Sequence, residues 1–85
     1  MSDISELGAV MLAWLAREPE RLRRFCMATG YDEASLKEDL GGEALGLAVM
    51  EHVLGDESLL MQFCAETGTP PEQPMRVWQR TQGET

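Results

Sequence analysis

The residues that could support catalysis in this chain are two cysteines and a single histidine. Cys26 and Cys64 lie 38 residues apart, and His52 lies between them. A thiol pair could serve redox chemistry, and Cys64 and His52 could form an activated nucleophile if the fold brought them together. Alternatively, both cysteines are small buried hydrophobic residues, since each follows a phenylalanine inside a predicted helix. We favour this second interpretation, because neither thiol lies at a helix start, where cysteines become reactive.

The spacing of these residues does not match a metal site or a catalytic pair. One histidine and two distant cysteines lack the spacing of zinc ligands. A general base also needs a positioned nucleophile and an orienting acid, and Glu51, next to His52, points elsewhere on a helix. The chain has no Gly-rich phosphate loop. The sequence therefore predicts no catalytic residue, no metal and no cofactor, and we expect the protein not to be an enzyme.

Arginines form one dense basic segment. Arg17, Arg21 and Arg24 share a face of a predicted helix, which makes them the candidate contacts for an anion. The following segment, residues 32–40, is strongly acidic, and the phosphates of a nucleic acid would repel it. We therefore expect no nucleic-acid binding. The arginines are expected to form a solvated face, with an ion pair between Glu20 and Arg24.

Composition is that of a small acidic globular domain. The 85 residues include 15 acidic and 7 basic side chains, a net charge of −8, and 44% are hydrophobic. This charge favours solubility and repels anionic lipid. The first residues lack the basic region of a signal peptide, and no uninterrupted apolar run, residues 44–50 included, reaches the roughly 20 residues of a membrane span. We expect a cytoplasmic protein that does not contact a membrane.

An internal repeat organises the chain. Sliding the sequence against itself by 38 residues aligns residues 20–30 with residues 58–68 and places His52 at the position of Trp14. The offset gives seven identical pairs: Leu7–Leu45, Gly8–Gly46, Leu22–Leu60, Phe25–Phe63, Cys26–Cys64, Thr29–Thr67 and Gly30–Gly68. These identities fall at positions critical for helices, so they indicate a duplication.

The repeat predicts an all-α domain over residues 1–80, built from two tandem helix-loop-helix units. The predicted regions are repeat one over about 4–40, repeat two over about 43–80, and a frayed tail over 81–85. Two further short helices, over residues 32–40 and after Pro70–Pro71, lie outside the two-helix pattern and bring the expected number to five or six. No segment alternates with the period of a strand.

Three apolar residues are candidates for contact with a partner. Tyr31 follows the glycine that ends a helix, and Met75 and Trp78 share one side of the last helix. Each also has a structural interpretation, in which Tyr31 packs back on its helix end and Trp78 closes the core. The sequence leaves Trp78 open between core and interface.

The sequence resembles a known bacterial family along nearly its whole length. The matching segments are residues 14–25, 29–31 and 52–60, and the resemblance covers roughly residues 9–80. These segments resemble DUF3572, a family of small helical proteins of unknown function. The resemblance implies a bacterial cytosolic protein of the same fold, and it implies no activity and no catalytic residues. The chain departs from the family pattern where Pro70, Pro71 and Pro74 crowd the start of the last helix.

These features favour a non-catalytic helical module for protein–protein interaction or regulation, present as a monomer or weak homodimer. One alternative is a homo-oligomeric structural protein whose methionine-rich faces or Trp78 close a symmetric interface. Another is a thiol-based or ligand-binding protein that uses Cys64 and His52. The identity of a protein partner is not encoded in any motif of the sequence.

Overall fold

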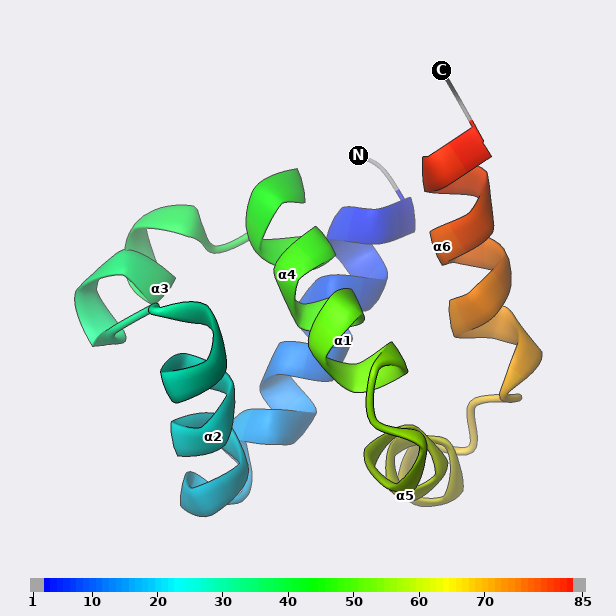
Figure 1. Cartoon of the computed structure of the whole chain (residues 1–85), viewed down its shortest axis with the longest axis horizontal. Coiled ribbons are helices and arrows are strands. Elements are labelled where there is room, and N and C mark those ends of the chain that lie inside the picture. Colours follow the sequence, from blue (N-terminus) through cyan, green and yellow to red (C-terminus); the bar gives the residue numbers. More distant parts are fainter. Residues whose placement is uncertain (1–2, 84–85) are drawn as a thin grey trace.

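The two halves of the chain fold into the same order of helices (Figure 1). The computed structural model describes residues 3–83, which form six helices and no strand. The helices are α1 (Asp3–Ala16), α2 (Pro19–Thr29), α3 (Glu33–Asp39), α4 (Glu43–Leu54), α5 (Glu57–Thr67) and α6 (Glu72–Gly83). α2 and α5 begin and end 38 residues apart, as the sequence repeat requires. The predicted all-α fold is confirmed.

Each unit has three helices rather than the two that we expected. α3 and α6 follow α2 and α5 in the same order along the chain, so the two segments that we set outside the two-helix pattern form the third helix of each repeat. At the offset of 38, no residue of α3 is identical to its counterpart in the second repeat. The alignment of the sequence with itself therefore gave no sign that α3 and α6 correspond. α6 also continues to Gly83, past the expected start of a frayed tail, and within it the Thr81 hydroxyl donates to the carbonyl of Val77. Residues 84 and 85 lie outside the described part of the chain.

The ends of α2 and α5 are built alike. Pro19 begins α2, where its missing N–H costs no hydrogen bond. Gly30 and Gly68 follow the two helices with φ of 82° and 73°, the left-handed conformation that glycine adopts without strain. The hydroxyls of Thr29 and Thr67 each donate to the carbonyl oxygen four residues earlier, at 2.8 and 2.7 Å. The identical Thr-Gly pairs of the sequence therefore mark two equivalent helix ends.

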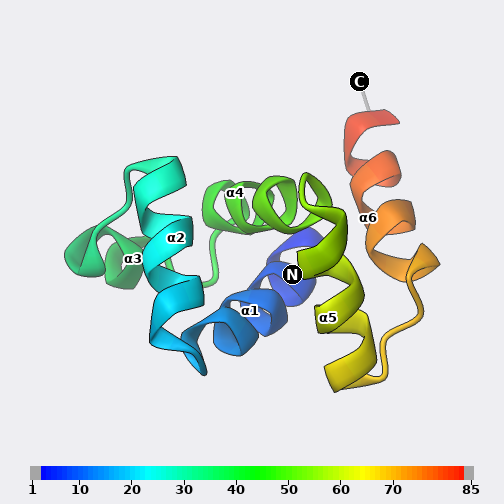
Figure 2. The same ribbon diagram turned by 60° about the horizontal axis from the view of Figure 1, so that its bottom comes forward.

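α1 and α4 cross at the centre of the molecule, with α2 and α3 on one side and α5 and α6 on the other (Figures 1 and 2). α4 contacts every other helix. The crossing is a direct contact of two backbones: a Cβ atom on Gly8 would lie 2.5 Å from the Cα of Gly46, and one on Gly46 would lie 2.7 Å from the carbonyl oxygen of Ile4. Only glycine at both positions allows this approach, because real Cβ atoms do not come so close to backbone atoms.

The buried core follows the same symmetry. Met11 and Leu15 on α1 and Val49 and Val53 on α4 are fully buried beside the crossing. The equivalent phenylalanines of α2 and α5 are also fully buried, one on each side of the central pair. Each repeat therefore supplies half of one continuous core rather than a core of its own.

We predict that Gly8→Ala destabilises the protein by about 1–3 kcal/mol, because the added methyl group forces α1 and α4 apart. Helix propensity alone gives the opposite sign, since alanine stabilises a helix interior by roughly 1 kcal/mol relative to glycine. Urea unfolding followed by circular dichroism measures the difference. A variant as stable as the unmodified protein would contradict the close crossing.

Candidate functional site

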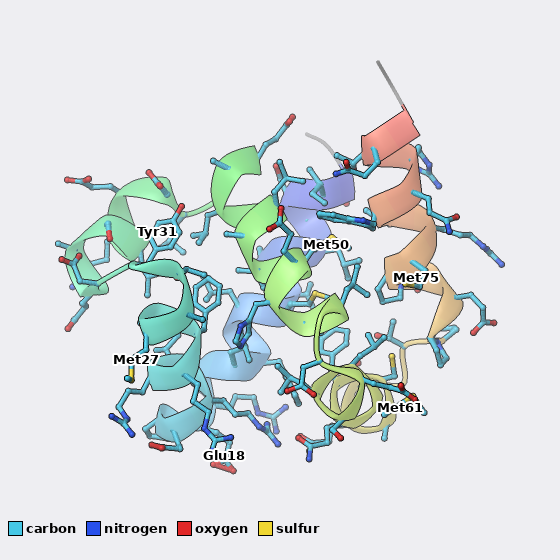
Figure 3. All side chains as sticks on the ribbon, viewed as in Figure 1. Glu18, Met27, Tyr31, Met50, Met61 and Met75 are labelled. Atoms are coloured by element: carbon cyan, nitrogen blue, oxygen red, sulfur yellow. The ribbon has the colours of Figure 1, made fainter. Side chains whose placement is uncertain are left out.

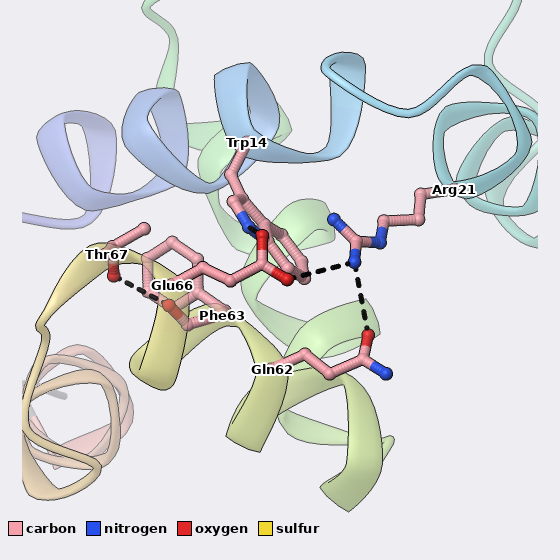
Figure 4. Close-up of polar contacts among 6 residues, drawn as sticks. All are labelled: Trp14, Arg21, Gln62, Phe63, Glu66 and Thr67. Atoms are coloured by element: carbon pink, nitrogen blue, oxygen red, sulfur yellow. Dashed lines mark hydrogen bonds and ion pairs between the residues drawn. The ribbon is translucent and has the colours of Figure 1, made fainter.

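Two arginines of the basic segment, Arg21 and Arg23, form contacts with other residues of the same chain. The guanidinium of Arg21 lies over the ring of Trp14, 4.2 Å from its centroid, and its Nη2 atom lies 3.3 Å from Glu66 Oε2 and 3.4 Å from Gln62 Oε1 (Figure 4). The indole N–H of Trp14 donates to the other oxygen of Glu66, at 3.0 Å. One carboxylate from α5 thus accepts from both residues and ties α1 and α2 to α5.

The electrostatics of Glu66 follow from these contacts. The hydrogen bond from Trp14 lowers the pKa of the Glu66 carboxyl, and the hydrogen bond and charge of Arg21, with the charge of Arg17, lower it further. Arg17 and Arg21, two of the candidate anion contacts, therefore both lower the pKa of a carboxyl group of the same chain. Arg24 is exposed on the same helix as Arg21.

The ion pair expected between Glu20 and Arg24 is wrong. Arg23 takes that place, with its Nε and Nη2 atoms 3.2 and 3.0 Å from the two carboxylate oxygens of Glu20. A guanidinium that reaches both oxygens forms the stronger, two-point contact, and here the i,i+3 spacing supplies it. Arg24 contributes only a charge that acts on Glu20 from a distance.

His52 repeats the packing of Trp14 without its polar partners. The rings of His52 and Phe25 meet edge to face at 5.3 Å and 74°, and those of Trp14 and Phe63 meet at 5.4 Å and 79°. Ala28 occupies the place that Glu66 has in the other repeat, so no carboxylate reaches the imidazole from α2. Instead a cavity of about 430 Å³ opens beside His52, Thr29 and Tyr31.

The chemistry available at His52 is limited by its surroundings. Burial lowers the pKa of the imidazole, and the charge of Asp56 opposes that shift. Within residues 3–83, no hydrogen bond joins His52 to Cys64, and no three His, Cys, Asp or Glu side chains gather as metal ligands would. The described residues therefore do not assemble the nucleophile and base that the thiol hypothesis requires.

The two cysteines differ in exposure. Cys64 is buried at 6% exposure and Cys26 is partly buried, and both are free thiols packed into the core. Burial, with the nearby charge of Glu72, raises the pKa of the Cys64 thiol and so disfavours its reactive thiolate.

The three apolar candidates for partner contact lie in different surroundings. Tyr31 stacks on Phe25 with ring centroids 6.1 Å apart, and its hydroxyl donates to Asp39 at 3.1 Å; burial and this hydrogen bond raise its pKa. Trp78 is partly buried against the core, whereas Met75 is 42% exposed. Figure 3 shows Met75 on the opposite side of the molecule from Tyr31, so the candidates do not form one surface.

An apolar groove lies where the sequence indicated no site. It has a volume of about 300 Å³ and runs between α1, α2 and α3, and its exposed lining is almost wholly apolar. The groove is lined by Ala9, Leu12, Ala13 and Ala16 from α1, Leu22 from α2, Glu33, Leu36 and Lys37 from α3, and Leu40, which follows α3. Leu40, at the rim, is 60% exposed.

The second repeat carries larger side chains at three of the aligned positions. At the offset of 38, Ala9 corresponds to Leu47, Ala16 to Leu54, and Leu40 to Trp78. The three larger residues are partly buried and packed against the core, whereas the three smaller ones are exposed. The groove therefore exists because repeat one carries smaller residues at these positions. The unequal sizes of aligned residues are the signal in the sequence that could have located it.

Comparison with known proteins gives a family for this fold. Residues 2–84 match the family model described as a protein of unknown function, DUF3572. The chain belongs to the DUF3572 family. No curated protein and no solved structure matches it. Within residues 3–83 of this DUF3572 chain, no helix has the length and apolar character needed to cross a membrane.

We predict that Glu66→Gln lowers the melting temperature of this DUF3572 protein at pH 7, because the neutral amide loses the ion pair with Arg21. Since folding lowers the pKa of Glu66 from its ordinary value of 4.5, the carboxylate stabilises the fold above that pH, and this stability is lost as the pH falls through the folded pKa. The difference between variant and unmodified protein should therefore shrink in acid. Glu38→Gln removes one exposed carboxylate from α3 as a control, and an equal loss in both variants would contradict the role of Glu66.

We further predict that Cys64 resists thiol reagents in the native protein and that Cys26 reacts faster. Cys26→Ser and Cys64→Ser each leave one thiol, so a chromogenic disulfide reagent reports the two rates separately at pH 8. The buried Cys64 should react at the rate of the free amino acid only in denaturant. Fast native labelling of the Cys26→Ser variant would contradict this prediction and favour the thiol hypothesis.

Proposed function

We propose that this DUF3572 chain is a protein-binding module whose groove between α1, α2 and α3 receives the apolar side chains of a partner's helix. The observation that carries the proposal is the unequal burial of three aligned pairs of residues. Leu47, Leu54 and Trp78 are partly buried against the core, whereas Ala9, Ala16 and Leu40 are exposed at the open groove.

The shape of the groove suits a helix. Ala9, Ala13 and Ala16 lie at i, i+4 and i+7, so α1 lines the groove mostly with methyl groups, beside the side chain of Leu12. Small residues let the backbone of a second helix approach closely. Leu36 on α3 and Leu40, directly after α3, form the opposite wall, against which larger side chains of the occupant would pack. This is the helix-in-groove mode of recognition, in which spaced apolar anchors are buried.

Burial of exposed apolar surface would drive the association. Leu40 is 60% exposed and lies next to an apolar cavity, an arrangement that a small domain gains from covering. The module itself contributes no covalent step to this function.

The test is to close the groove with the residues of repeat two. The double variant Ala9→Leu and Ala16→Leu copies Leu47 and Leu54, and it should abolish binding while leaving the melting temperature unchanged or higher, since the added side chains cover apolar surface. The probe is a synthetic amphipathic helical peptide of roughly 18 residues with one leucine and tryptophan stripe. Binding is followed by amide chemical shifts of the labelled protein.

A matched control separates the groove from general surface hydrophobicity. Ala65→Met places on α5 the residue that repeat one carries at its equivalent exposed position, Met27, and it lies outside the groove. This variant should bind the peptide as the unmodified protein does, with shifts centred on α1 and α3. If the filled variant binds equally well, or if no peptide binds, the groove is not the docking site.

A further inference from the structure

We infer that the cavity beside His52 binds a small organic cation, a guanidinium or ammonium group carried on a short alkyl chain. This His52 cavity lies between the end of α2, Tyr31 and α4, and its volume of about 430 Å³ is in the range of small-molecule sites. It shares no lining residue with the groove between α1, α2 and α3, so the inference does not depend on the proposed function.

The cluster around Trp14 shows how this fold holds a cation at the equivalent place. The guanidinium of Arg21 lies 4.2 Å from the centroid of the Trp14 ring and 3.3 Å from the carboxylate of Glu66 (Figure 4). A ring and a carboxylate thus bind one internal guanidinium. His52 aligns with Trp14 and packs on Phe25 with nearly the same edge-to-face geometry as Trp14 on the other phenylalanine. Both repeats therefore place a ring where a cation can reach it.

The aligned residues supply no such cation to the His52 cavity. At the offset of 38, Leu59 corresponds to Arg21, and Ala28 corresponds to Glu66. The methyl group of Ala28 is part of the cavity wall, opposite in kind to the charged chain of Glu66. Together with Ala48, it offers apolar contact to the alkyl chain of a ligand.

Acidic side chains surround this cavity instead. Glu51 on α4 lines it, and within residues 3–83 no ion pair or side-chain hydrogen bond engages this carboxylate. Asp39 accepts a hydrogen bond from the hydroxyl of Tyr31, which also lines the cavity. Arg24 on α2 is the counterpart of Gln62 in the other cluster, and it is not among the residues that line the cavity. The described lining therefore carries an acid and no base.

The end of α2 and the state of His52 also favour a cation. The last residues of α2, Ala28 and Thr29, line the cavity, and the last turn of this helix contains no basic residue. The carbonyl end of a helix carries partial negative charge, which attracts cations. Burial lowers the pKa of the imidazole from its ordinary value of 6.5, against the charge of Asp56, so the ring is mostly neutral at pH 7. Neutral aromatic rings attract a cation that approaches their faces.

An anionic ligand is disfavoured on the same grounds. A carboxylate or phosphate would approach Glu51 and the negative end of α2, within a chain of net charge −8. The cavity thus combines a carboxylate, two rings and two methyl groups, and this set matches an alkylated cation.

Three small probes with the same alkyl chain test the inference. Butylguanidinium is the cation, butylurea is its neutral analogue of nearly equal shape, and butyrate is the anion. Butylguanidinium should shift the amide signals around Ala28, Tyr31 and His52 at millimolar concentration. Butylurea should bind roughly tenfold more weakly, and butyrate should cause no shift there. Titrations of the isotope-labelled protein at pH 7 give the affinities.

Variants of the wall assign the effect to the cavity. Glu51→Gln should weaken butylguanidinium roughly threefold, because it removes an exposed charge. The matched control Glu43→Gln removes the same charge from the first turn of α4 and should bind as the unmodified protein does. Ala28→Leu places a larger side chain in the cavity wall and should abolish binding. The melting temperature of each variant confirms that it is folded.

Each contrary outcome bears on a separate part of the inference. Equal binding of butylguanidinium and butylurea overturns the cationic ligand, and shifts centred outside α2 and α4 overturn the site. Equal losses in Glu51→Gln and Glu43→Gln overturn the role of Glu51. Binding of arginine capped at both termini, without binding of butylguanidinium, would replace the small molecule with a side chain of a protein. None of these results depends on whether a helical peptide binds the groove.

Discussion

The close crossing of α1 and α4 at Gly8 and Gly46 is the constraint on which the rest of the structure depends. Because two backbones meet there, the helices bury their apolar faces against each other along both arms of the crossing. α2 and α5 then close the two sides with equivalent phenylalanines. A chain of this size has little surface to bury, so a contact that brings two helices this close fills the centre without large side chains.

The same frame holds different chemistry on its two sides. Trp14 is hydrogen-bonded to Glu66 beneath Arg21, and this polar cluster joins the N-terminal repeat to α5. His52 takes the equivalent place beside Phe25 and faces a cavity instead. The duplicated backbone therefore fixes where a ring packs, and the residues opposite the ring decide whether the place is closed by a carboxylate or left open.

Patterns local to the chain predicted most of the fold, and contacts between distant residues account for what they did not predict. Pro19, Gly30 and Gly68 gave the ends of helices because their backbone preferences act at one position. α3 and α6 were not assigned to the repeat, since capping by Asp32 and a run of prolines start them in different ways. The sequence repeat showed Gly8 and Gly46 as an identical pair. The periodicity of a sequence, however, does not give the distance between two helices. Arg21 meets Glu66 across 45 residues, and no local rule predicts such a pair.

The groove was hidden for a different reason, since it consists of what repeat one lacks. Alanines at positions 9 and 16 are ordinary on the exposed face of a helix, and they become informative only by comparison with the leucines at the equivalent positions 47 and 54. The second repeat shows that this frame accepts the larger residues and packs them. A small domain that leaves this groove open loses stabilisation from apolar burial that larger side chains at these positions would provide. Retained exposure of this kind is expected where a surface meets a partner, because the burial then takes place on binding rather than on folding.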